Sequence, residues 1–178
     1  MIILMGIAGS GKGTQGKILA DEYGYHWISS GDILRMYVTG ERRHRMLDGE
    51  LLDDDETIRI WDKVLASIID KDECVLDGFP RTIPQAEWLL EEAKHGRFKV
   101  TDVIHMVASR EAVTGRLLER GRQDDHTKAI EARFNEYERS TKPIIDWFKK
   151  EGIPVIKIDA EQPIKAVHQE IIKRLKLS

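Results

Sequence analysis

The sequence has almost no cysteine, few aromatic residues and no long apolar run. Cys74 is the only cysteine among 178 residues, so the chain can form no internal disulfide and no cysteine-based zinc site. No apolar run approaches the roughly 20 residues that a membrane-spanning helix needs. The net charge of −3 gives no general attraction to nucleic acid or to an anionic membrane. We therefore expect a cytoplasmic protein with no zinc site and with neither nucleic acid nor membrane as a partner.

Short apolar runs alternate with segments of helical periodicity along the whole chain. With 41% hydrophobic and 33% charged residues, the composition is that of one globular domain over residues 1–178. Parallel strands buried on both faces are short apolar runs of this kind. We predict a three-layer α/β/α fold whose five-stranded parallel sheet uses the runs Ile2–Met5, Trp27–Ile28, Cys74–Leu76, Val103–Val107 and Val155–Ile158.

A glycine-rich loop follows the first of these strands and precedes an amphipathic segment. Its glycines allow positive φ angles, so that backbone N–H groups can surround a phosphate at a helix N-terminus. Lys12 can reach the β- and γ-phosphates of a nucleotide, and Thr14 can hold Mg²⁺. Gly13 stands where the strict phosphate-binding pattern has serine or threonine. The predicted phosphate-binding residues are Gly9, Ser10, Gly11, Lys12, Gly13 and Thr14.

Two further segments place charged residues beside this loop. Asp77 ends a predicted buried strand, a position at which phosphoryl-transfer enzymes hold Mg²⁺ and its waters, and Arg81 follows at a helix start. After the second strand, Ser29 or Ser30 can cap a helix that carries Arg35 one turn on. Taken alone, this last segment is more typical of an ordinary capped helix with a surface arginine.

Three motifs resemble signatures of the adenylate kinases in order and spacing: GIAGSGKGTQ (6–15), ISSGDILR (28–35) and LDGFPRTIPQA (76–86). The similarity continues through RLLER (116–120), RQDD (122–125), Arg133, STKPII (140–145) and KIDA (157–160), so it covers nearly the whole chain. Glycine after the lysine is usual in that family. The resemblance implies a P-loop fold with a small helical AMP-binding subdomain at residues 30–70.

The resemblance also implies a role for each matching residue. ATP would contact Gly9, Ser10, Gly11, Lys12, Gly13, Thr14, Arg116, Arg120 and Ala160, with Mg²⁺ near Thr14 and Asp77. AMP would contact Ser30, Gly31, Arg35, Leu52, Gly78, Arg81, Gln85, Arg122 and Arg133. The catalytic residues would be Lys12, Arg35, Arg81, Arg120, Arg122 and Arg133. Arginine suits this chemistry because its planar fork binds phosphate oxygens bidentately and stays charged.

Other conspicuous residues have a plain structural interpretation. The run Asp53–Glu56 is typical of a helix N-cap and first turn, with a metal site as the less favoured reading. The basic run Glu41–Arg45 indicates a solvated helix face rather than a nucleic-acid surface. The histidines have no companion at metal-ligand spacing, and Trp61, Trp88 and Trp147 are expected to pack in the core.

One departure from the family concerns the lid, the insert that closes the ATP site in adenylate kinases. Only Gly121 separates Arg120 from Arg122, so the residual lid is the segment 116–126. We hypothesise that both arginines sit on a tight turn that Gly121 permits and reach the phosphates without a moving lid. Because a smaller lid leaves fewer walls around the base and the phosphates, we also expect broad donor use and raised ATP hydrolysis.

The favoured function is that of an adenylate kinase, the Mg²⁺-dependent reversible conversion of ATP and AMP into two ADP. A kinase for UMP or CMP is the first alternative, although the run Thr82–Gln85 favours AMP. A nucleotide-binding module with little turnover is the second. The retained cations argue against it, because a mere binder needs no cations between two nucleotide sites. The family default is a monomer, and the sequence leaves an oligomer open.

Overall fold

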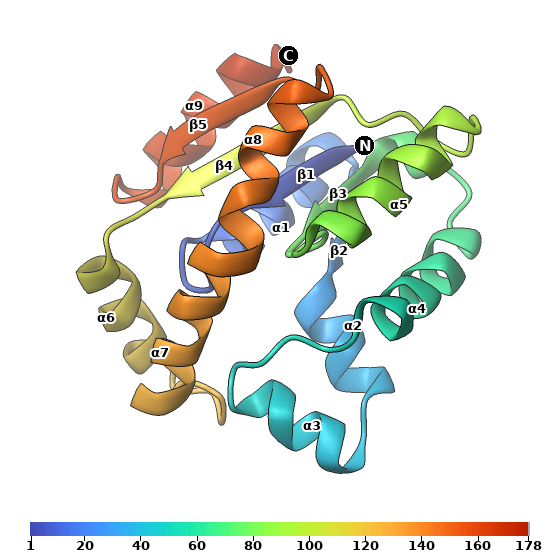
Figure 1. Ribbon diagram of the computed structural model, residues 1–178. Helices are drawn as coiled ribbons and strands as arrows, with labels where there is room; N and C mark the ends of the chain where they lie inside the picture. Colours follow the sequence, from blue (N-terminus) through green and yellow to red (C-terminus); the bar gives the residue numbers. More distant parts are fainter. Residues whose placement is uncertain (178) are drawn as a thin grey trace.

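The computed structural model describes residues 1–177, and its centre is a five-stranded sheet in which every strand runs parallel (Figure 1). The strand order is β2-β3-β1-β4-β5. The strands are β1 (Ile2–Met5), β2 (His26–Ser29), β3 (Cys74–Asp77), β4 (Asp102–Val107) and β5 (Val155–Asp159). The predicted five-stranded parallel α/β sheet is thus confirmed, and each strand lies where its apolar run placed it.

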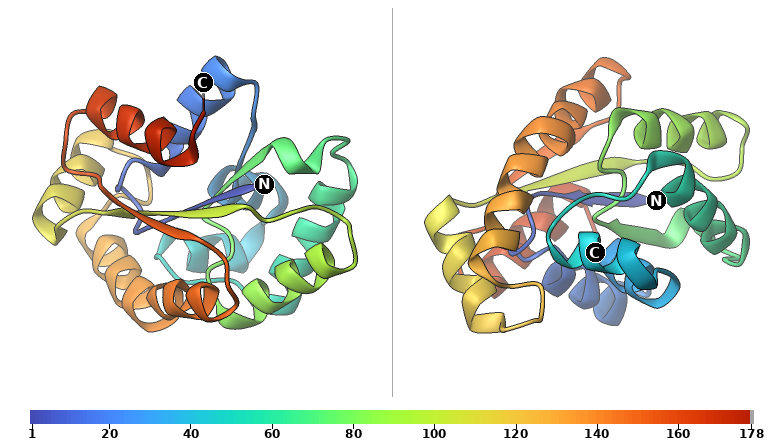
Figure 2. Two further views of the ribbon diagram at one scale, coloured as in Figure 1. Left: turned by 90° about the horizontal axis from the view of Figure 1, so that it is seen from above. Right: turned by 60° about the horizontal axis from the view of Figure 1, so that its bottom comes forward.

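Helices connect successive strands and cover both faces of the sheet. They are α1 (Lys12–Tyr23), α2 (Ser30–Tyr37), α3 (Gly40–Leu47), α4 (Asp54–Ala66), α5 (Ile83–Lys94), α6 (Arg110–Arg120), α7 (Thr127–Glu136), α8 (Lys142–Lys150) and α9 (Ile164–Leu175). A 3₁₀ turn lies at Lys71–Glu73, and a π-helical turn at Tyr137–Thr141 joins α7 to α8. Seen from above, α1 and α9 lie on one face of the sheet and α5 and α8 on the other (Figure 2).

The central strand shows why the first apolar run has no polar alternation. Side chains of a strand point alternately to opposite faces, and here both faces are buried. Ile3 and Met5 belong to the cluster on the α5 and α8 side, whereas Ile2 and Leu4 belong to the cluster on the α1 and α9 side. Each face therefore needs an apolar residue, and burial of the run anchors the loop that follows it.

The tryptophans on helices pack in the core, as predicted. Trp61 of α4 is fully buried and stacks on Phe79 with ring centroids 4.4 Å apart. Trp88 and Trp147 pack against the same cluster. Trp61 thereby anchors α4 to the apolar cluster on this face of the sheet.

Helices α2, α3 and α4 lie beside the sheet rather than over it (Figure 1). Ser29, not Ser30, caps α2 by accepting a hydrogen bond from the Asp32 N–H group. Asp53 caps α4 by accepting from two backbone N–H groups, which confirms the predicted cap. Helix α3 has no buried residue, so its basic run is a solvated face. These helices frame one side of the edge at which the strands end.

Candidate functional site

A cavity of about 660 Å³ lies at the edge where the carboxyl ends of the parallel strands meet, the usual ligand position in open α/β sheets. Every residue that the sequence singled out for nucleotide binding lines it. Those predicted for ATP are Gly9, Ser10, Gly11, Lys12, Gly13, Thr14, Arg116, Arg120 and Ala160. Those predicted for AMP are Ser30, Gly31, Arg35, Leu52, Gly78, Arg81, Gln85, Arg122 and Arg133, and Asp77 lines the same cavity.

The glycine-rich loop wraps around its own lysine. Gly11 has φ +95° and caps α1, so the loop enters the helix through a left-handed residue that favours glycine. The Lys12 ammonium donates to the carbonyls of Gly6 and Ile7, each at 2.8 Å. Burial lowers the pKa of Lys12 to about 8, although the charge of Asp77 opposes that shift. The lysine is therefore held at the mouth of the loop, beside the N-terminus of α1.

The structure gives a physical reason for Gly13, the residue that departs from the strict pattern. A Cβ at Gly13 would lie 3.3 Å from Asp77 Oδ2 and 3.5 Å from the Trp27 ring. At Gly16, one turn further on, a Cβ would lie only 2.2 Å from the same ring. Asp77 therefore crowds Gly13, and the Trp27 ring of β2 fills the space that a side chain at Gly16 would need. From the sequence, Trp27 was predicted only as part of a strand, without this contact.

Asp77 and Thr14 offer oxygen atoms on the same wall of the cavity. Carboxylate and hydroxyl oxygens are the donors that Mg²⁺ prefers, and Mg²⁺ usually takes only one or two protein ligands beside phosphates and waters. Residues 1–177 contain no cluster of three acidic, histidine or cysteine side chains that could hold a metal alone. The donor set therefore fits a Mg²⁺ ion that arrives with a nucleotide.

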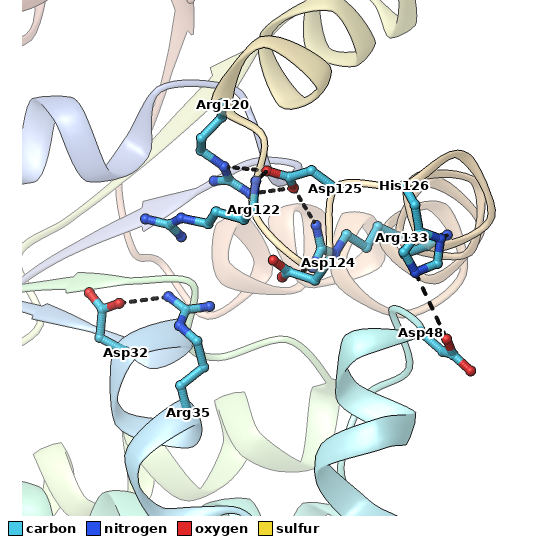
Figure 3. Close-up of polar contacts among 10 residues, drawn as sticks. Asp32, Arg35, Asp48, Arg120, Arg122, Asp124, Asp125, His126 and Arg133 are labelled. Carbon is cyan, nitrogen blue, oxygen red and sulfur yellow. Dashed lines mark hydrogen bonds and ion pairs between the residues drawn. The ribbon is translucent and has the colours of Figure 1, made fainter.

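Asp125 holds the arginines of the residual lid together (Figure 3). Its side chain has no exposed surface, and it accepts two hydrogen bonds from the Arg120 guanidinium at 2.6 and 2.8 Å. It also accepts one from the Arg122 N–H group at 3.0 Å and one from Arg133 at 3.2 Å. Asp124 forms a second ion pair with Arg133. We call Arg120, Asp124, Asp125 and Arg133 the lid knot.

Asp125 stays ionised although its side chain is buried. Burial alone raises the pKa of this carboxyl, but the hydrogen bonds from Arg120 and from the Arg122 backbone, with the nearby positive charges, outweigh burial and leave the pKa below its ordinary value. Both aspartates stand in a motif that matches the family, but no role was predicted for them from the sequence. Two adjacent carboxylates a few residues after two arginines were the available signal.

Gly121 makes the predicted turn between the two lid arginines. Helix α6 ends at Arg120, and Gly121 follows with φ +64° as its left-handed cap. The chain then turns through the bond from the Asp125 N–H group to the Arg122 carbonyl at 2.9 Å. In Figure 3 the Arg122 guanidinium extends away from the two aspartates, on the side of Asp32 and Arg35. A single glycine thus suffices to place one arginine in the knot and the next toward the cavity.

The arginines on the other side of the cavity are held differently. Arg81 donates from Nε to the Gly78 carbonyl at 2.7 Å, and within residues 1–177 it forms no ion pair with a carboxylate. Burial lowers its pKa, although Asp77 opposes the shift. Arg35 pairs with Asp32 of its own helix at 2.6 Å, and half of the Asp32 side chain is exposed. This side presents a positive charge without a matched buried carboxylate.

The corner between α3 and α4 reaches across the cavity to α7. A Cβ added at Gly49 would lie 2.7 Å from the Ala129 carbonyl oxygen, so the two backbones touch. Beside this contact, Asp48 lies 4.0 Å from His126 and 3.7 Å from Lys128 (Figure 3). His126 also caps α7. The α2–α4 region therefore closes against the segment that remains of the lid.

Comparison with known proteins gives a single family. The family model "Adenylate kinase" matches residues 4–153. The chain belongs to the adenylate kinase family. Curated adenylate kinases from Porphyromonas gingivalis, Corynebacterium glutamicum and Thermobifida fusca are 32%, 33% and 35% identical to it. These matches cover 85%, 98% and 98% of this chain and 84%, 98% and 97% of the relatives.

Adenylate kinases are nucleoside monophosphate kinases, and phosphoryl transfer between ATP and AMP is their standard activity. The predicted family and enzyme class are thus confirmed. Because the match covers 98% of both chains, the Corynebacterium glutamicum relative is about as long as this chain, so a chain of this length is no exception in the family. Among residues 1–177, no helix has both the length and the apolar character needed to cross a membrane.

Proposed function

We propose that this chain carries out the reaction of its family, ATP + AMP to two ADP and back, in the cavity between the glycine-rich loop and Arg81. The observation that supports this best is the placement of cations. Lys12, Arg81, Arg120, Arg122 and Arg133 all line one cavity. This number of positive charges matches the phosphates of two nucleotides better than those of one.

The donor triphosphate lies on the glycine-rich loop. The N–H groups of Gly9 to Thr14 and the N-terminus of α1 face its phosphates, and Arg116 and Ala160 border its base. Lys12 exchanges its bonds to the loop carbonyls for bonds to the phosphates. Their negative charge raises the pKa of Lys12 above its value of about 8 in the free protein, so the bound lysine stays protonated. Thr14 and Asp77 would hold Mg²⁺, which would neutralise charge on the bound phosphates.

The acceptor AMP lies on the other side, within a subdomain formed by residues 30–70. Arg35 and Arg81 grip its phosphate, because their planar forks bind two oxygens each. Ser30, Gly31, Leu52, Gly78 and Gln85 surround its ribose and base. Gln85 offers both a donor and an acceptor to the base edge. The phosphate of AMP supplies the counter-charge that Arg81 lacks in the protein.

Transfer needs positioning more than acid–base chemistry. An oxygen of the AMP phosphate attacks the γ-phosphorus of ATP, the bond from that phosphorus to the β–γ bridging oxygen breaks, and both products leave as ADP. The attacking oxygen is already anionic, so no general base is required. Arg120, Arg122 and Arg133 balance the charge on the transferred group. The lid knot holds two of these arginines in place, which replaces part of the work of a moving lid.

A coupled assay of ADP formation from Mg-ATP tests the proposal. AMP, UMP, CMP and GMP are supplied in parallel, with a tube lacking any acceptor as control. AMP-dependent ADP formation far above the control supports the adenylate kinase function. Strong activity with UMP or CMP alone would instead assign a pyrimidine specificity. Equal ADP in every tube would mean that the site loses ATP to water, and no ADP at all would leave only nucleotide binding.

Two expectations concern the residual lid, residues 116–126. Arg122→Ala should lower kcat, because Arg122 extends from the turn at Gly121 toward the cavity (Figure 3). An unchanged kcat would contradict this role. Broad use of nucleoside triphosphate donors and ATP hydrolysis above background should accompany the small lid. Strict ATP preference with hydrolysis at background would show that the contact of the α3–α4 corner with α7 closes the site completely.

A further inference from the structure

The side-chain amide of Gln85 is held from two sides. Gln85 lies in the first turn of α5, is only 2% exposed, and lines the acceptor side of the cavity. Its Oε1 accepts a hydrogen bond from the Arg81 N–H group at 2.9 Å, and its Nε2 donates to Asp54 Oδ1 at 2.8 Å. A backbone N–H group can only donate, and a carboxylate can only accept. The orientation of the amide is therefore fixed by chemistry.

Asp54 is itself fixed. It is the first residue of α4, and the same Oδ1 atom accepts a hydrogen bond from the Thr82 hydroxyl at 2.6 Å. Thr82 is the N-cap of α5, so the contact joins the two helices that border the acceptor side. If the Gln85 amide turned over, Oε1 would face the carboxylate and the NH₂ group would face the Arg81 N–H. Both contacts would be repulsive, and the one with the charged group would be the stronger.

The fixed amide has one N–H donor and one oxygen lone pair left for a ligand, in a set order. A purine base offers two edges of opposite order. Adenine has a donor at its 6-amino group and an acceptor at N1, whereas a 6-oxopurine has an acceptor at O6 and a donor at N1. An amide that could turn over would bind both edges. An amide that cannot turn over binds one and leaves the other unpaired, which carries a large penalty.

We propose that Asp54 is a positioning residue that sets the choice of acceptor base, adenine rather than a 6-oxopurine, by fixing the orientation of Gln85. This inference rests on the proposed function, in which Gln85 faces the AMP base. Asp54 does not line the cavity and acts only through Gln85. No other side chain in residues 1–177 hydrogen-bonds the Gln85 NH₂ group except that of Asp54.

The test compares AMP with IMP, which differs from it only in the two groups of the edge just described. In the wild-type protein, kcat/KM with Mg-ATP should be far higher for AMP. Asp54→Asn removes the charge but keeps the shape, and asparagine can pair with Gln85 in either orientation. The ratio of kcat/KM for AMP to that for IMP should fall about tenfold, the value of one charge-assisted hydrogen bond.

Asp53→Asn is the matched control. Asp53 is the neighbouring aspartate, caps α4 through its Oδ1 and contacts neither Gln85 nor Thr82. Asparagine is as good a cap as aspartate, so the ratio should stay at its wild-type value. In a Gln85→Ala background, Asp54→Asn should leave the ratio unmoved, because the residue that reads the base is gone.

The outcomes separate the inference from the proposed function. If the wild-type protein does not phosphorylate AMP, the proposed function fails. If it prefers AMP to IMP and Asp54→Asn lowers kcat/KM for both by the same factor, Asp54 has only a structural role and the inference is overturned. Thermal unfolding checks that each variant is folded at the assay temperature. If the asparagine variant is not folded at that temperature, Asp54→Ala gives the same test, because helices tolerate alanine well.

Discussion

The two sides of the cavity hold their arginines by different means. On the lid side, Arg120 of α6 and Arg133 of α7 are tied to the buried Asp125 before any nucleotide arrives. On the proposed acceptor side, Arg81 donates to a backbone carbonyl, and Arg35 has only the half-exposed Asp32. Fixed charges stabilise a transition state without reorganising. The lid side is therefore preorganised by the protein, whereas on the proposed acceptor side the substrate phosphate would supply the missing counter-charge.

This difference follows from the short lid. A long lid can bring its arginines to the phosphates by moving, whereas one glycine between Arg120 and Arg122 leaves no segment that could swing. The lid knot fixes the positions instead. The corner at Gly49, which touches α7, supplies the wall on the opposite side. If the two sides differ in this way, a change at Arg81 should cost mainly activity and a change at Asp125 mainly stability.

Arg81→Lys should have the largest effect on activity. A lysine cannot bind two oxygens of the acceptor phosphate in one plane, and the loss of one such group costs about 100- to 1000-fold in kcat. Stability should hardly fall, because lysine keeps the positive charge and Arg81 has no ion pair to lose among residues 1–177. Steady-state kinetics and urea unfolding measure the two quantities. Arg139→Lys, at an exposed pair, is the control, and a loss of kcat below tenfold for Arg81→Lys would contradict the expectation.

Asp125→Asn should have the largest effect on stability. It removes the charge that Arg120 and Arg133 share in a side chain with no exposed surface, and we expect the free energy of unfolding to fall by about 3 kcal/mol. Asp32→Asn, at the half-exposed acceptor pair, should cost at most about 1 kcal/mol. Chemical denaturation of both variants gives the comparison. Equal losses would mean that the lid side is no more preorganised than the acceptor side.

The stability that Asp125 contributes to the folded protein depends on pH with a defined sign. The pKa of Asp125 is lowered in the folded protein, so its contribution is present above the ordinary pKa of an aspartate, about 3.9. It is lost as the pH falls through the folded value, because the unfolded chain takes up the proton first. The stability gap between the wild type and Asp125→Asn should therefore shrink toward pH 3. If the gap stayed constant down to that pH, the charge of Asp125 would not be the cause of the stability difference.

Lys12 should make the donor side, and not the acceptor side, sensitive to alkaline pH. Burial lowers its pKa to about 8 in the free protein, so above that pH it loses the charge that attracts ATP. We expect kcat/KM for ATP to fall about tenfold per unit above pH 8. With ATP saturating, kcat/KM for AMP should stay level to about pH 9, because Arg81 keeps its charge. Parallel pH–rate profiles check this, and two profiles of the same shape would contradict it.

Gly49→Ala should have the smallest effect and reports on the closing wall. Both Gly49 and Gly40 have positive φ, but a Cβ at Gly49 meets a carbonyl oxygen of α7, whereas one at Gly40 meets nothing within 4 Å. Each alanine should lower the free energy of unfolding by about 1 kcal/mol, because a residue with a Cβ is strained in the left-handed conformation. Only Gly49→Ala should also raise the KM for AMP and the rate of ATP hydrolysis. Matching kinetics for the two variants would show that the corner does not close the site.

Most of the sheet and one side of the site could be predicted from short-range pattern. Five apolar runs gave five strands, because a strand buried on both faces has nearly every side chain in the core. The glycine-rich loop, Asp77 and Arg81 reach one cavity because parallel strands all end at the same edge. The capping residues were equally local, since Asp53 accepts from N–H groups within its own first turn.

The contacts that give the site its character depend on residues distant in sequence. Nothing near Gly16 in the chain shows that Trp27 fills the space beside it. Nor does the run from Arg122 to Asp125 show that one carboxylate would take hydrogen bonds from both flanking helices. Asp54, Thr82 and Gln85 meet because α4 packs against α5, and because Trp61 of α4 stacks on Phe79 in the loop that precedes α5. Local sequence is enough to show which elements form and which edge of the sheet carries the chemistry, because periodicity and backbone preference are local. Which charges are paired follows only from the packing of the helices, because the partners are distant in the chain.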